Sequence, residues 1–551
     1  MLPLQYADGR KCTERIDAGL LESNGAMPHL VPPQSNSESE VSPLTASSRW
    51  RIPPAFLAIA LVFVLLAGVQ VITKRPWVDE AWFTGPALDL TTHGRFGTPV
   101  LDPTGSHLTL FKPGVVLTGI DRHTYWIMPL YPLTLAAWGK VFGFSVFSMR
   151  VPSLFWGLLL LGSLWVMVRR FGGSEGAAAL AAAILGVEFG FIDSGSDGRM
   201  DMMSAALGFA GLAVYLSLRE RNLLRAVLAG HALCAASLFT HPNGMFAAAS
   251  LMICILWLDL RQVSVKLAGA IAAPYVVGML AWGVYILRAP AEFIAQFGAN
   301  SSHRSRALLN PFKAIWDEFV MRYLQHHFLP WYGGPAACMK VIGLLLFMGA
   351  FALMLATPEL RRPSGFRLLL WLAGLRFLMM SVGASWKLEY YLVHAVPLYA
   401  AIAGIAGWWL WNQQDRRRRL TAAAALGFYF AVQLAVFAHL VSAVSAYRKK
   451  YLPAVNYVKS ILRPNDLVAG SADLAFAMGF YNPQLVDDIW LGHWSGKRPT
   501  IVVVDEWYYG ECMIMSEATA VPYTSWVADE LKSRFTQVKK FDGYSIYRRV
   551  N

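Results

Sequence analysis

Residues Pro53–Ile72 read PPAFLAIALVFVLLAGVQVI and contain no charged side chain. Twenty residues of α-helix rise about 30 Å, which is the thickness of the hydrocarbon layer of a membrane. This stretch therefore predicts a membrane-spanning helix. The residues before it are polar and rich in Ser and Pro, so we expect a disordered N-terminus over residues 1–50 and an uncleaved first span.

The composition agrees with a chain whose main solvent is lipid. Hydrophobic residues make up 56% of the 551 residues and charged residues 15%, whereas soluble proteins carry about a quarter charged residues. The net charge of +13 does not require a nucleic-acid partner, because membrane proteins collect Lys and Arg on their cytoplasmic loops. The composition predicts a multi-pass integral membrane protein that binds no nucleic acid.

Ten further apolar segments follow the first, which gives about 11 predicted spans in all. They are residues 147–168, 175–192, 201–218, 223–240, 243–259, 267–287, 337–356, 366–383, 391–411 and 420–442. Every second connector is basic: Arg169–Arg170, Arg219–Arg225, Arg261–Lys266, Arg361–Arg367 and Arg416–Arg419. By the positive-inside rule, this alternation places the N-terminus in the cytoplasm and the C-terminal tail outside.

The same alternation decides how residues 126–144 are interpreted. A span there would reverse the side of every later basic connector, so we expect a helix at the outer membrane interface, or a shallow re-entrant one. Asp79–His93 is a second candidate for an interfacial helix in this first external loop. Residues 288–334 form another long external loop.

The fold class predicted is mainly α: a polytopic transmembrane bundle over residues 51–446 and a small α/β domain outside the membrane over residues 447–551. In this domain Thr500–Asp505 is typical of a buried strand and Tyr544–Arg548 alternates like an edge strand. Ser525–Phe535 fits a helix between them.

The first external loop begins RPWVDEAW (Arg75–Trp82), which places Asp79 and Glu80 just past the first span. A carboxylate at a partly desolvated membrane surface suits a general base. The two acids could equally cap the interfacial helix that follows them.

A second acidic stretch, FIDSGSDGRMDMM (Phe191–Met203), joins the third and fourth spans on the same side. A short turn needs one or two polar residues, and this one carries Asp193, Asp197, Arg199 and Asp201. Asp201 could be part of a site or could cap the fourth span.

Other candidates lie at the same membrane face. Lys387 in SWKLEYYLVHAVPL goes against the positive-inside rule, so an anion is a reasonable partner for it. Arg122 in GIDRHTYW could meet a phosphate or a lipid headgroup, and His123 follows it. Tyr391 could be an interfacial aromatic residue, and His241 in FTHPNG could serve the turn that it begins.

The sequence contains no Walker motif, HExxH, GxSxG with a triad, or zinc-ligand spacing. We therefore expect no nucleotide, metal or other cofactor. Acids and cations gathered at a lipid–water boundary suit transfer from a lipid phosphate, in which a carboxylate deprotonates the acceptor and a cation stabilises the departing phosphate.

Taken together, these motifs resemble the C-type membrane glycosyltransferases, in the branch of protein O-mannosyltransferases and aminoarabinose transferases. The resemblance rests on Asp79–Glu80, on HTYWIMPLYPL (His123–Leu133) with FGFSVFSMRVPSL (Phe142–Leu154), on GRMDMM (Gly198–Met203) and on WKLEYYLVHAVPL (Trp386–Leu398). It covers about residues 53–406.

The resemblance implies an inverting transfer of a sugar from a polyprenyl-phosphate donor on the outer face of a bacterial inner membrane, to a lipid, protein or glycan acceptor. Asp79 would be the catalytic base and Asp201 would support the site. Glu80 would hold the acceptor, and Lys387 the donor phosphate. Arg199 departs from the family pattern, because Met200 follows it where the family often has proline.

Two other functions remain open at this point. A transporter or flippase of lipid-linked sugars would place ionisable residues within its spans, as Arg376 is placed in the ninth. A scaffold whose tail binds an envelope partner would not need acids and a lysine on one face.

Overall fold

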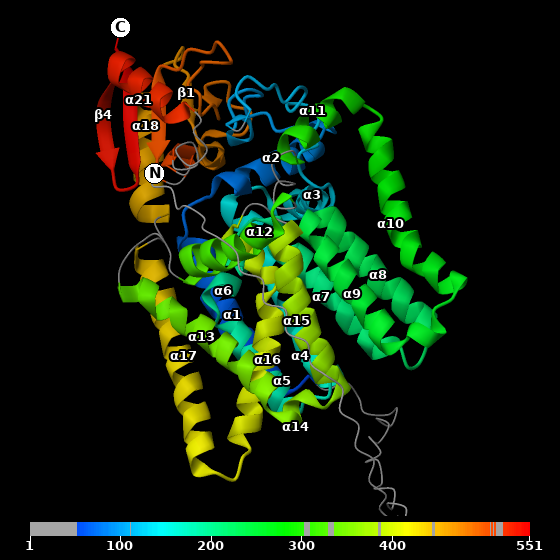
Figure 1. Ribbon diagram of the computed structural model, residues 1–551. Helices are drawn as coiled ribbons and strands as arrows, with labels where there is room; N and C mark the ends of the chain where they lie inside the picture. Colours follow the sequence, from blue (N-terminus) through cyan, green and yellow to red (C-terminus); the bar gives the residue numbers. More distant parts are fainter. Residues whose placement is uncertain are drawn as a thin grey trace, which may run out of the picture. The chain divides into compact units, whose positions relative to one another are not determined.

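The computed structural model describes residues 52–550, apart from residues 111, 302–308, 329–334, 384–386, 444–446, 507, 511 and 514–521. The disordered N-terminus predicted for residues 1–50 lies outside the described residues. The rest of the chain, Ile52–Asn551, forms one compact unit, which is mainly helical (Figure 1).

Seven helices in the described chain are long and apolar enough to cross a membrane. They are α1 (Pro54–Thr73), α4 (Val146–Arg170), α7 (Met200–Leu218), α8 (Leu223–Thr240), α10 (Val265–Ile286), α15 (Ser364–Gly383) and α17 (Arg416–Ala443). Three further apolar helices occupy predicted spans: α9 (Met245–Leu258), α13 (Pro335–Ala356) and α16 (Val396–Trp411). The chain is an integral membrane protein.

The predicted span at residues 175–192 is not one straight helix. It is divided into α5 (Glu175–Gly186) and α6 (Phe189–Gly195), which are bent by 69°. Side chains accept hydrogen bonds from the free backbone N–H groups at the start of α6 and so stabilise the bend. Glu188 accepts from the N–H of Phe191 (2.7 Å) and Gln433 from the N–H of Phe189 (3.0 Å). The predicted span at residues 391–411 also differs, because α16 begins only at Val396 and a 3₁₀ helix, η6 (Glu389–His394), precedes it.

Small residues let the central helices approach closely. A Cβ atom on Gly211 of α7 would lie 2.7 Å from the carbonyl oxygen of Gly230 in α8, and one on Gly404 of α16 would lie 2.6 Å from the Cβ atom of Ala181 in α5. Such packing is usual between helices in a membrane. Lipid tails are as apolar as the side chains, so helices associate through close van der Waals contact and not through the hydrophobic effect. α7 is the most buried of the seven candidate spans.

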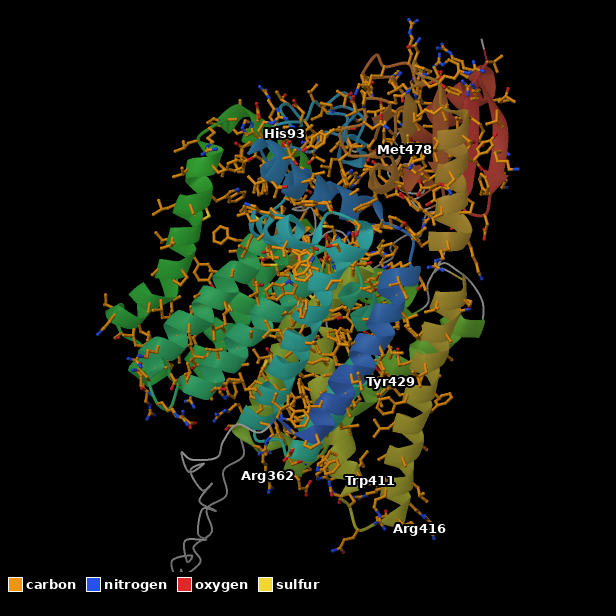
Figure 2. The ribbon with its side chains drawn as sticks, turned by 180° about the vertical axis from the view of Figure 1, so that it is seen from behind. His93, Arg362, Trp411, Arg416, Tyr429 and Met478 are labelled. Atoms are coloured by element: carbon orange, nitrogen blue, oxygen red, sulfur yellow. The ribbon has the colours of Figure 1, made fainter. Side chains whose placement is uncertain are left out.

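The basic connectors gather at one end of the bundle, which we call the basic end. Figure 2 shows Arg362, Trp411 and Arg416 at this end, and His93 and Met478 at the other, which we call the domain end. The basic connector that contains α14 (Pro358–Arg361) lies beside the first basic connector, because Gly365 contacts the carbonyl group of Phe171. This arrangement agrees with the alternation of charge along the sequence.

The long loops are built from short helices at the domain end (Figure 1). Both segments that were predicted to lie at the membrane interface contain a helix, α2 (Val78–His93) and α3 (Leu130–Phe142). α3, at 13 residues or about 20 Å, is too short to span a membrane. In the region predicted as a loop at residues 288–334, the described part contains α11 (Pro290–Ser301), α12 (Pro311–Asp317) and the π-helix η5 (Glu318–Phe328).

The C-terminal region contains one mixed sheet, with strand order β2-β1-β3-β5-β4. Its strands are β1 (Val468–Gly470), β2 (Leu485–Val486), β3 (Ile501–Asp505), β4 (Phe535–Phe541) and β5 (Tyr544–Arg549), and its main helices are α18 (Leu452–Ile461) and α21 (Tyr523–Arg534). The buried strand and the helix agree with the prediction. The predicted edge strand does not, since β5 lies between β3 and β4 and the exposed, lysine-bearing β4 forms the edge.

Buried polar contacts join this sheet region to the first external loop. The indole of Trp82 on α2 donates to Asp487 (2.9 Å), and the backbone of Asp102 donates to the carbonyl oxygen of Asp487 (3.0 Å). The C-terminal region therefore packs directly against the helix that carries Asp79.

Candidate active site

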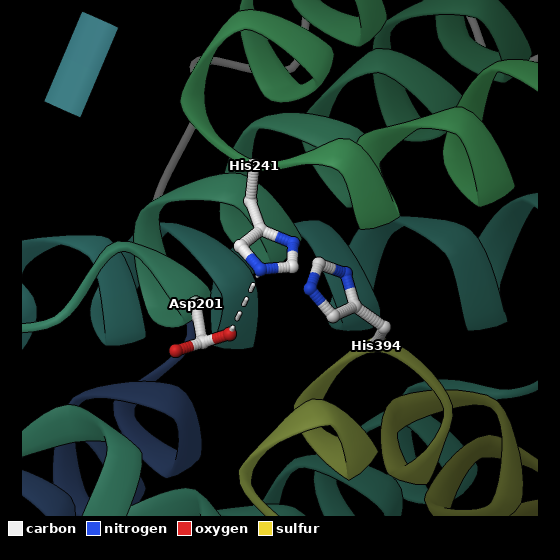
Figure 3. A group of neighbouring side chains, drawn as sticks. All are labelled: Asp201, His241 and His394. Atoms are coloured by element: carbon white, nitrogen blue, oxygen red, sulfur yellow. Dashed lines mark ion pairs between the residues drawn. The ribbon is translucent and has the colours of Figure 1, made fainter. Parts of the chain in front are cut away.

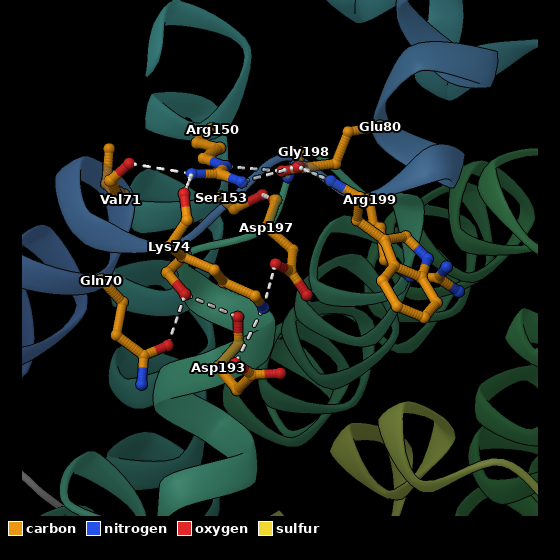
Figure 4. Close-up of polar contacts among 12 residues, drawn as sticks. Gln70, Val71, Lys74, Glu80, Arg150, Ser153, Asp193, Asp197, Gly198 and Arg199 are labelled. Carbon is orange, nitrogen blue, oxygen red and sulfur yellow. Dashed lines mark hydrogen bonds and ion pairs between the residues drawn. The ribbon is translucent and has the colours of Figure 1, made fainter. Parts of the chain in front are cut away.

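Glu80 is the centre of a buried polar network at the start of α2 (Figure 4). Its two carboxylate oxygens accept from Arg150 Nε (2.6 Å) and Nη2 (2.7 Å), from the backbone of Gly198 (2.8 Å) and from the backbone of Trp77 (2.8 Å). Burial alone would raise the pKa of Glu80, but the charge and hydrogen bonds of Arg150 outweigh it and lower that pKa. These four bonds hold the Glu80 carboxylate to α4, to the turn at Gly198 and to the start of α2. The contact with the acceptor that the resemblance implies stays a prediction.

Arg150 on α4 connects three segments at this point. Besides Glu80, its guanidinium donates to the carbonyl oxygens of Val71 (3.0 Å), Lys74 (2.8 Å) and Arg75 (2.8 Å) at the end of α1. Both charged side chains are fully buried. Arg150 thus fixes the end of α1, the start of α2 and, through Glu80, the turn at Gly198.

Lys74 holds the same turn from the other side (Figure 4). Its ammonium group pairs with Asp193 (2.8 Å) and with Asp197. Burial raises the pKa of Asp197 to about 7, an effect that Lys74 opposes and that the neighbouring Asp193 and Glu80 charges reinforce. Two of the four charged residues of the FIDSGSDGRMDMM stretch are therefore used to position the turn.

Arg199, which immediately follows this turn, joins the two acids that were predicted to be catalytic. It forms ion pairs with Asp79 in the first turn of α2 and, through Nε, with Asp201 (3.1 Å) in the first turn of α7. Its guanidinium also lies over the ring of Tyr390, 3.8 Å from the centroid. The structure brings Asp79, Arg199 and Asp201 together, and the side chains of all three are mostly buried.

His241 and Tyr391 extend this group. The Nε2 atom of His241 faces Asp201 Oδ1 at 3.9 Å, and the His241 ring lies 6.1 Å from that of His394 (Figure 3). The His241 ring also lies 5.2 Å from the ring of Tyr391. Asp201, His241 and His394 are all buried, and their possible ligand atoms lie within 4.8 Å of one another. Among the described residues, this is the group that could hold a metal ion.

Lys387 lies at the other side of the two tyrosines. Its ammonium group pairs with Glu318 (3.1 Å) and donates to the carbonyl oxygen of Ser381 (2.6 Å). Burial lowers the pKa of Lys387, and Glu318 opposes this effect. Arg322 pairs with Glu318 as well (2.8 Å) and lies over the ring of Tyr391, 5.8 Å from the centroid. A continuous line of contacts therefore runs from Lys387 to Asp79.

Arg122 and His123 are placed elsewhere. Both contact Glu292 on α11, at 3.3 Å and 2.8 Å respectively, and Arg122 is more than half exposed. The contacts found for them in the described chain fasten the first external loop to α11. They are not brought into the Asp79–Arg199–Asp201 group.

Arg376, the ionisable residue in the ninth predicted span, is bound to its neighbours. It donates to the carbonyl oxygens of His394 (2.5 Å) and Phe246 (3.1 Å) and to the hydroxyl of Ser250 (2.8 Å). Arg376 therefore has a structural explanation: it ties α15 to α9 and to η6, which carries Tyr391.

Sequence reasoning missed Lys74, Arg150, Glu318, Arg322 and His394. A signal for Arg150 was present, because an arginine within the apolar run of a predicted span must find a partner. Glu318 and Arg322 lie in a long region without a motif, and only the fold brings them to Lys387.

No known protein-family model matches the chain, and no curated protein matches it. Solved structures do. ArnT from Cupriavidus metallidurans, bound to undecaprenyl phosphate, superposes with a TM-score of 0.57 over 90% of this chain and 97% of ArnT, at 13% sequence identity. The oligosaccharyltransferase AglB from Archaeoglobus fulgidus, in complex with an inhibitory peptide and a dolichol-phosphate, superposes with a TM-score of 0.55 over 90% of this chain and 74% of AglB, at 11% identity. The chain thus has the fold of the C-type membrane glycosyltransferases that its sequence resembles.

Proposed function

We propose that the protein transfers a sugar from a polyprenyl-phosphate donor to an acceptor, with inversion, and that Asp79 is the general base. The observation that carries this proposal is the ion-paired group of Asp79, Arg199 and Asp201 at the domain end of the bundle. Contacts through Tyr390, Tyr391, Arg322 and Glu318 connect this group to Lys387. The fold shared with ArnT bound to undecaprenyl phosphate supports a lipid-phosphate donor.

The charges in this line of contacts are divided unevenly. Among the ion pairs of the described residues, the Glu318 carboxylate has two cationic partners, Lys387 and Arg322. Around Arg199 there are two carboxylates, Asp79 and Asp201, for one cation. An anionic donor phosphate is therefore expected at Lys387 and Arg322, and the proton-accepting chemistry at Asp79.

The reaction is then a single displacement. Asp79 takes the proton of the acceptor hydroxyl or amine, the acceptor attacks the anomeric carbon from the face opposite the phosphate, and the bond between that carbon and the phosphate oxygen breaks. Lys387 stabilises the charge that develops on the departing polyprenyl phosphate. In this proposal the two cations serve in place of a metal ion, and no nucleotide or other cofactor takes part.

The side of the membrane follows from the charge pattern. If the basic end faces the cytoplasm, as the positive-inside rule predicts, the domain end and its candidate site face the outside of a bacterial inner membrane. The acceptor would be a lipid, protein or glycan in the envelope.

A transporter of lipid-linked sugars is the alternative. Arg376 favoured it, and the contacts of Arg376 with two carbonyl oxygens and Ser250 now give that residue a structural role. Charged groups gathered at one end of the spans suit chemistry better than passage through the middle of the membrane.

The test is transfer of radiolabelled sugar from polyprenyl-phosphate donors to an envelope extract by the purified protein. Asp79→Asn should reduce transfer about a hundredfold or more, while Asp529→Asn on the exposed face of α21 should not. Thermal unfolding checks that both variants fold. Transfer by Asp79→Asn at the wild-type rate would exclude Asp79 as the base, and donor movement across vesicles without any transfer would favour the transporter.

A further inference from the structure

The orientation of the His241 ring is fixed by the turn that it begins. In FTHPNG, the backbone N–H of Asn243 donates to Nδ1 of His241 (3.0 Å) within the 3₁₀ helix η2 (Pro242–Gly244). A backbone N–H can only donate, so Nδ1 carries no proton, and the neutral ring has its proton on Nε2.

This tautomer decides what His241 offers to Asp201. Nε2 is the atom that faces Asp201 Oδ1 at 3.9 Å (Figure 3). This distance is longer than a hydrogen bond, so the N–H group acts on the carboxylate through its dipole. The other oxygen of Asp201 accepts from Arg199. Asp201 therefore lies between a cation and a ring N–H, and each oxygen faces one of them.

His394 is the third member of the group, and it remains neutral. Burial, together with the cations Arg376 and Arg322, lowers the pKa of His394 to about 3. Its Nε2 atom has no hydrogen-bond partner among the described residues, and the side chain is buried. His394 thus lies beside Asp201 as a neutral side chain, and Arg199 is the cation that pairs with Asp201.

A metal ion would fit the three residues by distance but not by proton placement. To bind a cation through Nε2, His241 would have to carry its proton on Nδ1, where it would meet the N–H of Asn243. The turn at η2 therefore opposes metal binding by His241 in this position.

We infer that His241 is a positioning residue, which holds the Asp201 carboxylate in the orientation that keeps Arg199 between Asp201 and Asp79. The inference rests on the proposed function for its role in catalysis, but the His241–Asp201 contact itself does not. The FTHPNG turn thereby gains a role. It fixes the tautomer of His241, and this tautomer orients the Asp201 carboxylate.

Two substitutions separate this role from a merely structural one. The amide nitrogen of Gln in His241→Gln can take the place of the Nε2–H, whereas the amide oxygen of Asn in His241→Asn can take the place of Nδ1 and keep only the turn. If His241 positions Asp201, His241→Gln should retain a substantial share of wild-type kcat and His241→Asn should lose at least tenfold, with a smaller change in KM for the donor. His231→Phe is the matched control, since His231 is a buried histidine in α8 bonded to Tyr275; it should leave kcat near wild type.

A second measurement does not depend on activity. The shifts in unfolding temperature of His241→Asn and Asp201→Asn should not add in the double variant, because the two side chains interact. Wild-type protein should contain no stoichiometric metal by elemental analysis, and EDTA should leave its unfolding temperature unchanged.

The outcomes are distinct. If wild type transfers no sugar, the proposed function fails, and the unfolding cycle still decides whether His241 and Asp201 interact. Additive shifts would overturn the inference, as would a His241→Asn variant more active than His241→Gln. One equivalent of metal, lost from both His241→Asn and His394→Asn, would show that the group is a metal site.

Discussion

Arg150 holds the carboxylate of Glu80 with two hydrogen bonds, of 2.6 and 2.7 Å, although neither side chain reaches solvent. Glu80 directly follows Asp79 in the sequence, and it also accepts from the backbone of Gly198, the residue before Arg199. The residue predicted to contact the acceptor is thus bound to Arg150 within the chain.

Removal of one member of this pair should destabilise the protein. Arg150→Met leaves a buried carboxylate without its cation, and changes of this kind cost about 3–5 kcal/mol. We expect a clearly lower unfolding temperature in detergent. Arg122→Met, which removes a half-exposed arginine from its contact with Glu292, should change it little. An Arg150→Met protein as stable as wild type would show that the buried pair does not hold the three segments together.

Substitution of Lys387 should act mainly on the donor. Lys387→Gln removes one of the two cations around Glu318, so we expect a raised KM for the polyprenyl-phosphate donor, of about tenfold for each 1.4 kcal/mol of lost interaction. Lys387→Arg should be less harmful because it keeps the charge. Because Lys387 is also proposed to stabilise the departing phosphate, kcat should fall as well. Steady-state kinetics at varied donor concentration measure both, and an unchanged kcat/KM for the donor would place the phosphate elsewhere.

The stability of the C-terminal region should depend on pH. Burial, together with the charge of Asp505, raises the pKa of Asp473 from 3.8 to about 8. Between these values the folded protein holds a proton that the unfolded chain has released, so stability should fall as pH rises from about 4 to about 8. Asp473→Asn should flatten this part of the curve of unfolding temperature against pH, whereas Asp529→Asn should leave its slope as in wild type.

Close helix packing gives a steric prediction. Gly211→Ala places a methyl group 2.7 Å from the carbonyl oxygen of Gly230, so the helices must separate, at a cost of about 1–3 kcal/mol. Gly269→Ala in α10 meets nothing within 4 Å and should be neutral or slightly stabilising. Equal unfolding temperatures for the two variants would contradict the packing described between α7 and α8.

The sequence predicted the fold well where lipid dictates the pattern. The positions of the long apolar helices follow from apolar length, and helices are present in both segments predicted to lie at the membrane interface. The bend between α5 and α6 could not be predicted, because it depends on a contact between Phe189 and the distant Gln433. The edge strand was wrong for a similar reason, since alternation along Tyr544–Arg548 does not show which strands flank it.

The candidate site was predicted in part. Asp79, Arg199 and Asp201 meet, and local sequence had singled out all three. Their partners could not be found in this way, because Glu318 reaches Lys387 and His394 reaches His241 only through folding. Glu80 and Arg122 were predicted to contact substrate because of their charge. In the structure each pairs with a residue of the chain, Glu80 with Arg150 and Arg122 with Glu292.

The three carbonyl groups that Arg150 binds at the end of α1 have a consequence for the depth of the site in the bilayer. Because α1 and α4 are fastened at this point, a change in membrane thickness must tilt the two helices together. Asp79 would then keep its level relative to Arg199 even where lipid and protein lengths do not match. The exposed residues of α1 can thus adapt to the surrounding membrane, while the height of the Asp79 carboxylate is set by a polar clamp.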